Sequence, residues 1–128
     1  MLFRSAHVEV TDAHVPDDPE DIAACLEATL NDHDMVVVSG GVSVGRLDHV
    51  PAVLKRLGVR QVFHTVAQRP GRPMWFGVSR EGKLVFGLPG NPVAALVCVV
   101  RYVLPALALA EGAPPMRPDA AALAKSLS

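Results

Sequence analysis

The pattern of apolar and polar residues predicts strands that alternate with helices. Residues 7–10 alternate weakly, which indicates a short strand. Apolar residues recur at helical spacing from Pro19 to about Asn31, and Asp18 stands where an N-cap is expected, with Pro19 at the first helical position. Residues 35–38 form a continuous apolar run, which is typical of a central parallel strand that is covered on both faces.

The second half of the chain continues the alternation and adds a hairpin. Helical spacing from Leu47 to Leu57 stops at Gly58, and residues 59–67 indicate a strand. The runs 74–79 and 83–86 predict a hairpin, and residues 92–110 predict a long apolar helix. This order predicts an α/β fold: a three-layer sandwich with a mostly parallel sheet and one antiparallel hairpin.

Two glycine-rich turns follow predicted strands. The first is Ser39-Gly40-Gly41-Val42-Ser43-Val44-Gly45, and the second is Gly87-Leu88-Pro89-Gly90-Asn91-Pro92. Because parallel strands end at the same edge of a sheet, we expect the two turns to face one another across one pocket, and such a place suits a phosphate or another anion. Asn91 has a simpler alternative role as the N-cap of the long helix.

Four charged residues are candidates for the chemistry of this pocket. Asp17 and Asp48 each lie near a predicted helix start, and two carboxylates that approach one another can flank a divalent cation. The alternative is that Asp48 is an N-cap and Asp17 a turn residue. Arg69 and Arg72 flank Pro70-Gly71, where two guanidinium groups could hold an oxyanion or simply lie in a solvated loop.

The composition of the chain gives no reason to expect nucleic acid or a membrane as a partner. The chain has 128 residues and a formal net charge of −1, which gives no electrostatic reason to expect nucleic acid. No apolar run approaches the roughly 20 residues of a membrane span, and the start lacks a signal-peptide pattern, so we expect no membrane association. Cys25 and Cys98 are far apart in helical patterns, which predicts two reduced thiols in a cytoplasmic protein.

The two glycine-rich turns, Asp48 and Arg69-Pro70-Gly71-Arg72-Pro73 together resemble the molybdopterin-binding domain of molybdopterin molybdenumtransferases, the family that includes the E domain of gephyrin. The resemblance implies insertion of molybdenum from molybdate into adenylylated molybdopterin with release of AMP, assisted by Mg²⁺ or another divalent cation. It implies that Asp48 and Asp17 serve the cation and catalysis. The substrate-binding residues that it implies are Ser39, Gly40, Gly41, Val42, Ser43, Val44, Gly45, Arg69, Arg72, Pro89, Gly90, Asn91 and Pro92.

This chain also departs from the family pattern. Arginines stand at 69 and 72 where the family commonly has lysines, and Thr65 stands where a basic residue is often found. The resemblance implies that residues 1–110 are a partial domain whose amino-terminal strand and helix are missing. Residues 111–128 would be a linker and the start of a truncated carboxyl-terminal β domain. Residues 2–5 match the translation of a sequencing-adaptor end, so we expect residues 1–5 to be non-native.

The resemblance leaves three functional expectations open. In the leading one, the full-length protein is a homodimeric, cytoplasmic transferase, and this fragment is weak or inactive alone. The second is a non-catalytic module that binds a pterin or phosphate or acts as a scaffold. The third is a molybdopterin adenylyltransferase, which usually has a Gly-Gly-Thr-Gly turn that this chain lacks.

Overall fold

The computed structural model describes residues 8–41 and 49–112. Within them the elements follow in the order α1 (Pro19–Asp32), β1 (Met35–Ser39), α2 (Val50–Arg56), β2 (Arg60–His64), β3 (Trp75–Val78), β4 (Leu84–Leu88), α3 (Pro92–Cys98), the π-helical turn η2 (Val99–Val103) and α4 (Leu104–Ala110). The predictions for residues 1–5 and 113–128 lie outside the described part of the chain.

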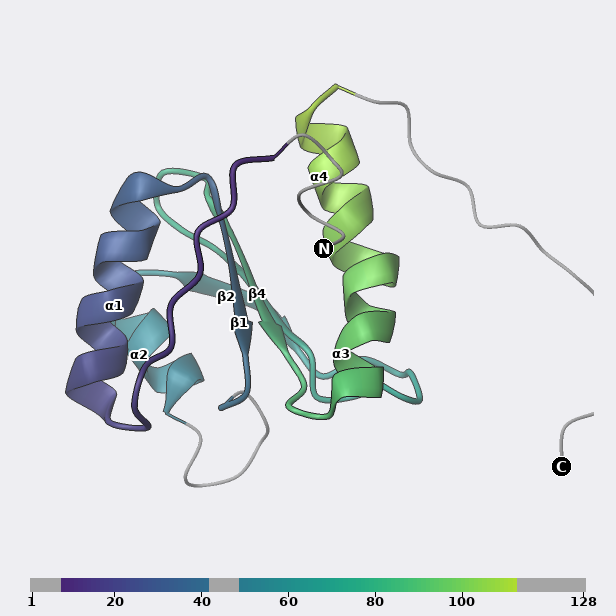
Figure 1. The fold of residues 1–128 in the computed structure, drawn as a ribbon, viewed down its shortest axis with the longest axis horizontal. Helices are drawn as coiled ribbons and strands as arrows, with labels where there is room; N and C mark the ends of the chain where they lie inside the picture. Colours follow the sequence, from purple (N-terminus) through teal and green to yellow (C-terminus); the bar gives the residue numbers. More distant parts are fainter. Residues whose placement is uncertain (1–7, 42–48, 113–128) are drawn as a thin grey trace, which may run out of the picture.

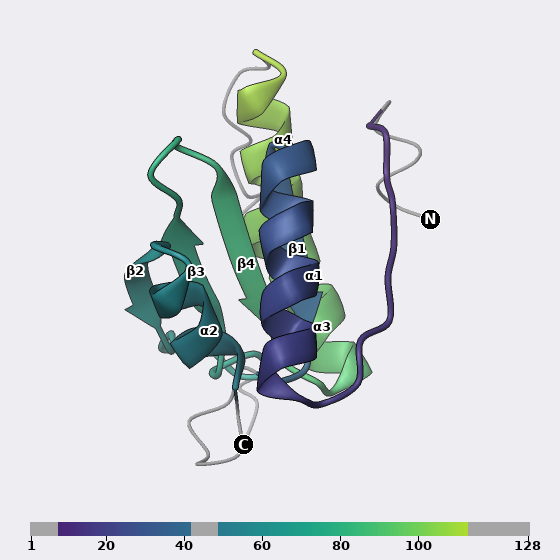
Figure 2. The ribbon, with the colours of Figure 1, turned by 90° about the vertical axis from the view of Figure 1, so that its left-hand side faces the viewer.

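The four strands form one mixed sheet in the order β1-β4-β3-β2 (Figures 1 and 2). β1 runs parallel to β4, whereas β3 is antiparallel to both β4 and β2. One row of paired residues crosses all four strands: Val38, Gly87, Trp75 and His64. The strands therefore share a common edge immediately beyond this row.

Helices cover both faces of the sheet, which confirms the predicted three-layer α/β sandwich. Helices α1 and α2 lie on one face, and the helix formed by α3, η2 and α4 lies on the other (Figure 1). Each interface has its own apolar core. Leu54 and Val85 belong to the core beneath α1 and α2, whereas Met74, Cys98 and Val103 belong to the core beneath the long helix.

A local cap begins α1, and a distant lysine contacts its end. The Asp18 carboxylate accepts hydrogen bonds from the amides of Glu20 at 3.0 Å and Asp21 at 3.1 Å, which confirms the predicted N-cap. No basic residue stands in the last turn of α1. Instead, the Lys83 ammonium reaches across from the hairpin and donates to the carbonyl oxygens of Leu30 and, at 3.3 Å, Asn31. A cation from a distant segment thus interacts with the negative end of the helix dipole.

Three details of the predicted sheet are wrong. Residues 8–10 are not a strand; they belong to an extended segment in which Thr11 is hydrogen-bonded to His33 rather than to a neighbouring strand. The sheet is mixed rather than mostly parallel, because ten residues without a helix join β2 to β3 and parallel pairing needs a longer crossover. Met35–Ser39 lies at the end of the described sheet rather than at its centre, and Val37 is 39% exposed.

The predicted hairpin and long helix are present, with differences in detail. The β3–β4 hairpin closes through hydrogen bonds between Ser79 and Lys83, as predicted. The strand expected over 59–67 ends at His64, because Thr65 has a φ of 106° and leaves the extended conformation. The expected helix over 92–110 contains a π-turn, which periodicity does not reveal.

The helix Pro92–Ala110 also corrects the expectation that no apolar run approaches the length of a membrane span. By length and composition alone, these 19 residues could cross a membrane, and they are the single such helix in the part of the chain that the structure describes. This is a weak indication, because core helices of soluble proteins pass the same test. The residues of this helix that belong to the apolar core beneath it include Cys98, Val99 and Val103, all buried.

Candidate functional site

The two glycine-rich turns lie side by side at the shared edge of the sheet. Ser39, the last residue of β1, pairs with Leu88, the last residue of β4. The Gly40 amide donates to the Leu88 carbonyl oxygen at 3.3 Å, and a Cβ at Gly90 would lie 3.9 Å from Gly40 Cα. The structure therefore confirms that the two predicted turns are neighbours.

The two glycines of the first turn have different surroundings. Both have positive φ, 86° at Gly40 and 68° at Gly41, which L side chains rarely adopt. A Cβ at Gly41 would lie 2.9 Å from Cγ2 of Val50, so this residue packs tightly against α2. A Cβ at Gly40 would meet nothing within 4 Å, so the backbone there is open to a ligand. Val42, Ser43, Val44, Gly45 and Asp48 lie outside the described residues.

The second turn leads into α3. The Asn91 side-chain oxygen accepts from the amides of Val93 at 3.0 Å and Ala94 at 3.1 Å, and Pro92 occupies the first turn of the helix. The simpler role of Asn91, an N-cap, is therefore confirmed. Pro89 is buried and Gly90 is exposed at the surface of the turn. The cap fixes the direction in which α3 leaves the edge of the sheet.

The arginine-bearing loop lies at the same edge, farther along the sheet. It connects His64 at the end of β2 to Trp75 at the start of β3, and these two residues belong to the row that Val38 and Gly87 continue. Three inter-strand spacings separate β1 from β2, so the glycine turns and this loop lie within about 15 Å along the edge. The loop borders an open hollow of about 470 Å³ that is lined by Thr65, Val66, Ala67, Gln68, Arg69 and Arg72. Arg69 and Arg72 are both exposed, and the Arg69–Pro70 peptide bond is cis.

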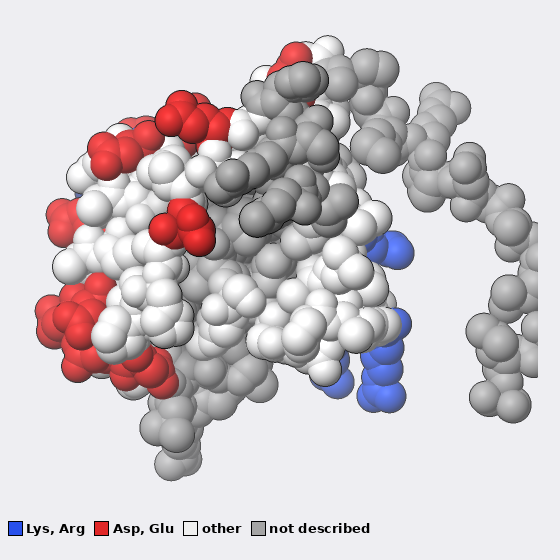
Figure 3. Space-filling model, viewed as in Figure 1, with Lys and Arg blue, Asp and Glu red and all other residues white. Residues whose placement is uncertain are grey.

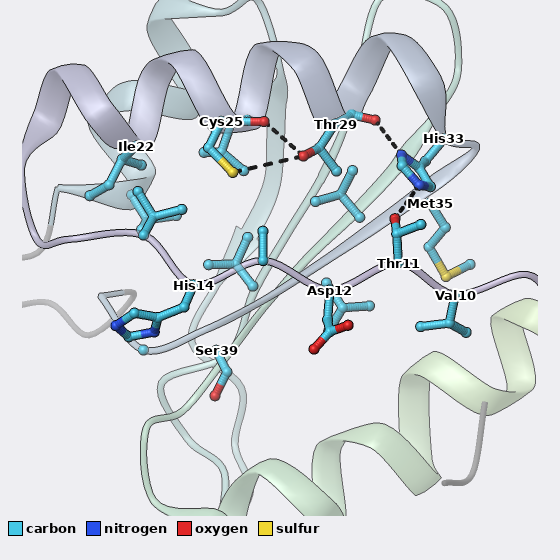
Figure 4. A pocket seen from close by; sticks show the side chains of 18 of the residues that line it. Val10, Thr11, Asp12, His14, Ile22, Cys25, Thr29, His33, Met35 and Ser39 are labelled. Atoms are coloured by element: carbon cyan, nitrogen blue, oxygen red, sulfur yellow. Dashed lines mark hydrogen bonds between the residues drawn. The ribbon is translucent and has the colours of Figure 1, made fainter. Parts of the chain in front are cut away.

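A larger cavity of about 730 Å³ lies between α1, β1 and residues 8–15 (Figure 4). Asp17, Ser39, Gly40 and Gly41 all line it, so the structure brings Asp17 and the first glycine turn to one cavity. The second turn and the two arginines are not among its lining residues. The two glycine turns are therefore neighbours, as expected, but only the first of them lines this cavity.

Of the two aspartates predicted as cation ligands, the structure describes only Asp17. Asp17 is exposed and does not cap α1, because Asp18 does. It also follows an irregular segment rather than the strand that the alternation of residues 7–10 predicts. Within residues 8–41 and 49–112, no group of three or more His, Cys, Asp or Glu side chains is arranged to hold a metal ion. Of the predicted pair of cation ligands, the structure thus describes one.

Several polar residues that the sequence did not indicate lie on the wall of the larger cavity. Figure 4 shows Thr11, Asp12 and His14 on the extended segment and Thr29 and His33 on the α1 side. His33 Nδ1 contacts the Thr29 carbonyl oxygen at 3.0 Å and therefore carries the proton, so Nε2 accepts from the Thr11 hydroxyl at 2.5 Å. No local pattern along the chain indicates that these residues share one cavity wall.

In the view of Figure 3, acidic side chains gather on the side of α1, and the visible basic side chains lie at the opposite side, below the long helix. The Arg101 guanidinium stacks over the Tyr102 ring at 5.9 Å. Burial raises the pKa of the Cys98 thiol above its ordinary value of 9.0, and a hydrogen bond with Gln68 partly opposes this shift. Cys25 and Cys98 are both free thiols, as predicted.

The chain is similar in sequence to known proteins. Residues 1–109 match the family model MoCF_biosynth, described as a probable molybdopterin binding domain. The chain is 42% identical over 92 residues to the molybdopterin molybdenumtransferase of Synechocystis sp., covering 71% of this chain and 24% of that protein. It is 48% identical over 79 residues to the Drosophila melanogaster molybdenum cofactor synthesis protein cinnamon, covering 62% of this chain and 13% of that protein. The chain thus spans a quarter or less of these two relatives.

Two solved structures share the fold. The molybdopterin biosynthesis MoeA protein of Pyrococcus horikosii superposes with a TM-score of 0.66 at 39% identity, covering 77% of this chain and 23% of that one. The molybdopterin biosynthesis enzyme MoaB of Thermus thermophilus superposes with a TM-score of 0.55 at 28% identity, covering 79% of this chain and 73% of that one. The chain therefore belongs to the family of molybdopterin-binding domains of molybdenum cofactor biosynthesis.

Proposed function

We propose that this chain is the substrate-binding part of a molybdopterin molybdenumtransferase, which inserts molybdenum from molybdate into adenylylated molybdopterin and releases AMP. The observation that carries the proposal is the common edge of the sheet. Two glycine turns and a loop with two arginines lie beyond one row of paired residues, from Val38 to His64. The identity of about 40% to named molybdenumtransferases supports this activity in particular.

The chemistry of the edge suits two anionic substrates. Gly40 leaves its backbone open, so a phosphate group of the pterin can approach closely. Arg69 and Arg72 are exposed guanidinium groups beside an open hollow, and guanidinium binds tetrahedral oxyanions through paired N–H donors. We assign the pterin phosphate to the glycine turn and molybdate to the arginine loop.

A divalent cation, which we take to be Mg²⁺, would be held by carboxylates. Asp17 fits this role chemically, because Mg²⁺ prefers oxygen ligands and Asp17 lines the cavity that also reaches Gly40. Asp48 is the second proposed ligand. When bound, the cation would neutralise charge that develops on the phosphate during AMP release. The homodimeric state and the cytoplasmic location of the full-length protein are further parts of this proposal.

The test uses carboxylate variants of the 128-residue chain. Adenylylated molybdopterin and molybdate are mixed with the chain and Mg²⁺, and AMP release is followed by chromatography while pterin binding is followed by calorimetry. We expect pterin binding with slow AMP release. Asp17→Asn and Asp48→Asn should each lower AMP release at least about tenfold, since each removes a charged ligand, while the pterin still binds.

Asp32→Asn is the matched control, because Asp32 is an exposed aspartate at the far end of α1. It should leave both readouts unchanged. Pterin binding without any AMP release would overturn catalysis by this chain, and the same result with the full-length protein would favour a non-catalytic binding module. Consumption of ATP with unmodified molybdopterin would instead favour a molybdopterin adenylyltransferase.

A further inference from the structure

Gln68 lies at the base of the arginine loop and contacts three separate segments. Its Nε2 donates to the Pro70 carbonyl oxygen at 2.8 Å and to Cys98 Sγ at 3.8 Å. Its Oε1 accepts from the Tyr102 hydroxyl at 2.9 Å. Cys98 ends α3 and Tyr102 lies in the π-turn η2, so one amide joins the loop to two successive parts of the long helix.

The orientation of this amide is fixed by its partners. The Pro70 carbonyl oxygen can only accept, so it must face the NH₂ group of Gln68. The amide oxygen therefore faces Tyr102, whose hydroxyl donates. Both donors and the acceptor of the side chain are in use, which leaves no second orientation of equal quality.

The loop packs closely around this amide. A Cβ at Gly71 would lie 2.4 Å from Gln68 Nε2 and 2.8 Å from Cys98 Sγ, so only glycine fits there. The Cys98 thiol donates in turn to the Gly71 carbonyl oxygen at 3.7 Å. Figure 1 shows the loop between β2 and β3 beside the beginning of α3. The turn between the two arginines is thereby seated on the long helix.

The two arginines are anchored by different means. The Arg72 carbonyl oxygen accepts from the amides of Val66 and Met74, both at 2.9 Å, so the backbone holds the carboxyl side of the turn. On the amino side, next to Arg69, the Pro70 carbonyl oxygen is held by the Gln68 side chain. The position of Arg69 relative to Arg72 thus depends on Gln68.

We propose that Gln68 is a positioning residue that sets the spacing of Arg69 and Arg72 for a tetrahedral oxyanion, through its hydrogen bonds to Pro70, Cys98 and Tyr102. This inference rests on the proposed function for the oxyanion role of the arginines. Gln68 itself need not touch the ligand. The π-turn has a part in this arrangement, because it carries Tyr102, the residue that orients the Gln68 amide.

The test measures binding of molybdate, the probe, to variants of the 128-residue chain by calorimetry. Gln68→Met removes all three hydrogen bonds at similar side-chain size and should weaken molybdate binding about tenfold, which corresponds to about 1.4 kcal/mol. Tyr102→Phe removes one bond and should weaken binding about threefold. The double variant should bind no more weakly than Gln68→Met, because Tyr102 acts through Gln68.

Gln61→Met is the matched control. Gln61 also carries a side-chain hydrogen bond, which it accepts from Trp75 Nε1 at 3.0 Å, but it lies on β2 away from the arginine turn. It should leave molybdate binding unchanged. Unchanged binding in Gln68→Met, additive losses in the double variant, or an equal loss in Gln61→Met would each overturn the positioning role.

A second measurement separates this inference from the proposed function. If the unmodified chain fails to bind molybdate, the oxyanion role assigned to the arginines is overturned. Amide hydrogen exchange then tests the positioning role directly. Gln68→Met should speed exchange at the amide of residue 68, which donates to the Val66 carbonyl oxygen on the amino side of the turn, whereas Gln61→Met should not. Equal exchange in Gln68→Met and the unmodified chain would overturn the inference on its own.

Discussion

The Gly40 amide and the Leu88 carbonyl oxygen are joined by a hydrogen bond of 3.3 Å just beyond the ends of β1 and β4. This bond joins the two glycine turns through residues that lie 48 positions apart in the sequence. It also turns the backbone of Gly40 into a fixed part of the sheet edge, while the space where a side chain would lie stays open.

Alkylation rates should differ between the two cysteines. Cys98 is fully buried and its thiol pKa is raised by desolvation, so its reactive thiolate is scarce at pH 8. Cys25 is only half-buried. With a thiol reagent at pH 8, we expect Cys25 to react at least about tenfold faster than Cys98, because access and thiolate content both favour it. Mass spectrometry of the labelled peptides measures both rates, and equal rates would contradict this burial.

The raised pKa of Cys98 also predicts a pH dependence of stability. A thiol with a higher pKa in the folded state holds its proton longer there than in the unfolded chain. The contribution of this thiol to the free energy of unfolding is therefore complete below the ordinary pKa of 9.0. It is lost as the pH rises through the pKa of the thiol in the folded state. The free energy of unfolding in urea should fall more between pH 8 and pH 10 in the unmodified chain than in Cys98→Ala, with Cys25→Ala as the control that keeps the full dependence.

Lys83 should stabilise α1 from outside the helix. Its ammonium donates to carbonyl oxygens at the carboxyl end of α1, where the helix has no basic residue of its own. Lys83→Met should lower the free energy of unfolding by about 0.5–1 kcal/mol, an effect that decreases with added salt. Arg60→Met is the control, because Arg60 is exposed on β2 and belongs to no helix. A loss that does not change with salt would argue against an electrostatic origin.

Thr11 should hold the extended wall of the larger cavity in place. Its hydroxyl donates to His33, which joins residues 8–15 to the end of α1. Thr11→Val should therefore speed protease cleavage within residues 8–15 several-fold, because the open state of the segment becomes more populated. Thr29→Val removes a hydroxyl whose bond to the Cys25 carbonyl oxygen lies within α1, so it should leave cleavage of this segment unchanged.

Features that adjacent residues specify were predictable from the sequence. The start of α1 followed from Asp18 and Pro19, and the hairpin from Arg80-Glu81-Gly82, because caps and tight turns are specified by adjacent residues. The neighbouring glycine turns followed from the rule that parallel strands end at one edge.

The failures involve contacts between distant segments. The direction of β2 depends on how residues 65–74 fold back, and the role of Gln68 depends on Cys98 and Tyr102, about thirty residues away. The π-turn at Val99–Val103 shifts a hydrogen-bond register without any change in composition. The network of Thr11 and His33 joins an aperiodic segment to a helix, which no local pattern encodes.

Gly40 provides the most direct test of the central claim that the first glycine turn binds the phosphate of adenylylated molybdopterin. Gly40 and Gly82 have nearly the same φ, 86° and 82°, and an added Cβ meets nothing within 4 Å at either position. Gly40→Ala and Gly82→Ala should therefore cost similar stability, about 1 kcal/mol each. By calorimetry with adenylylated molybdopterin, we expect Gly40→Ala to weaken binding at least about tenfold and Gly82→Ala to bind like the unmodified chain; equal affinity of the two variants would contradict the claim.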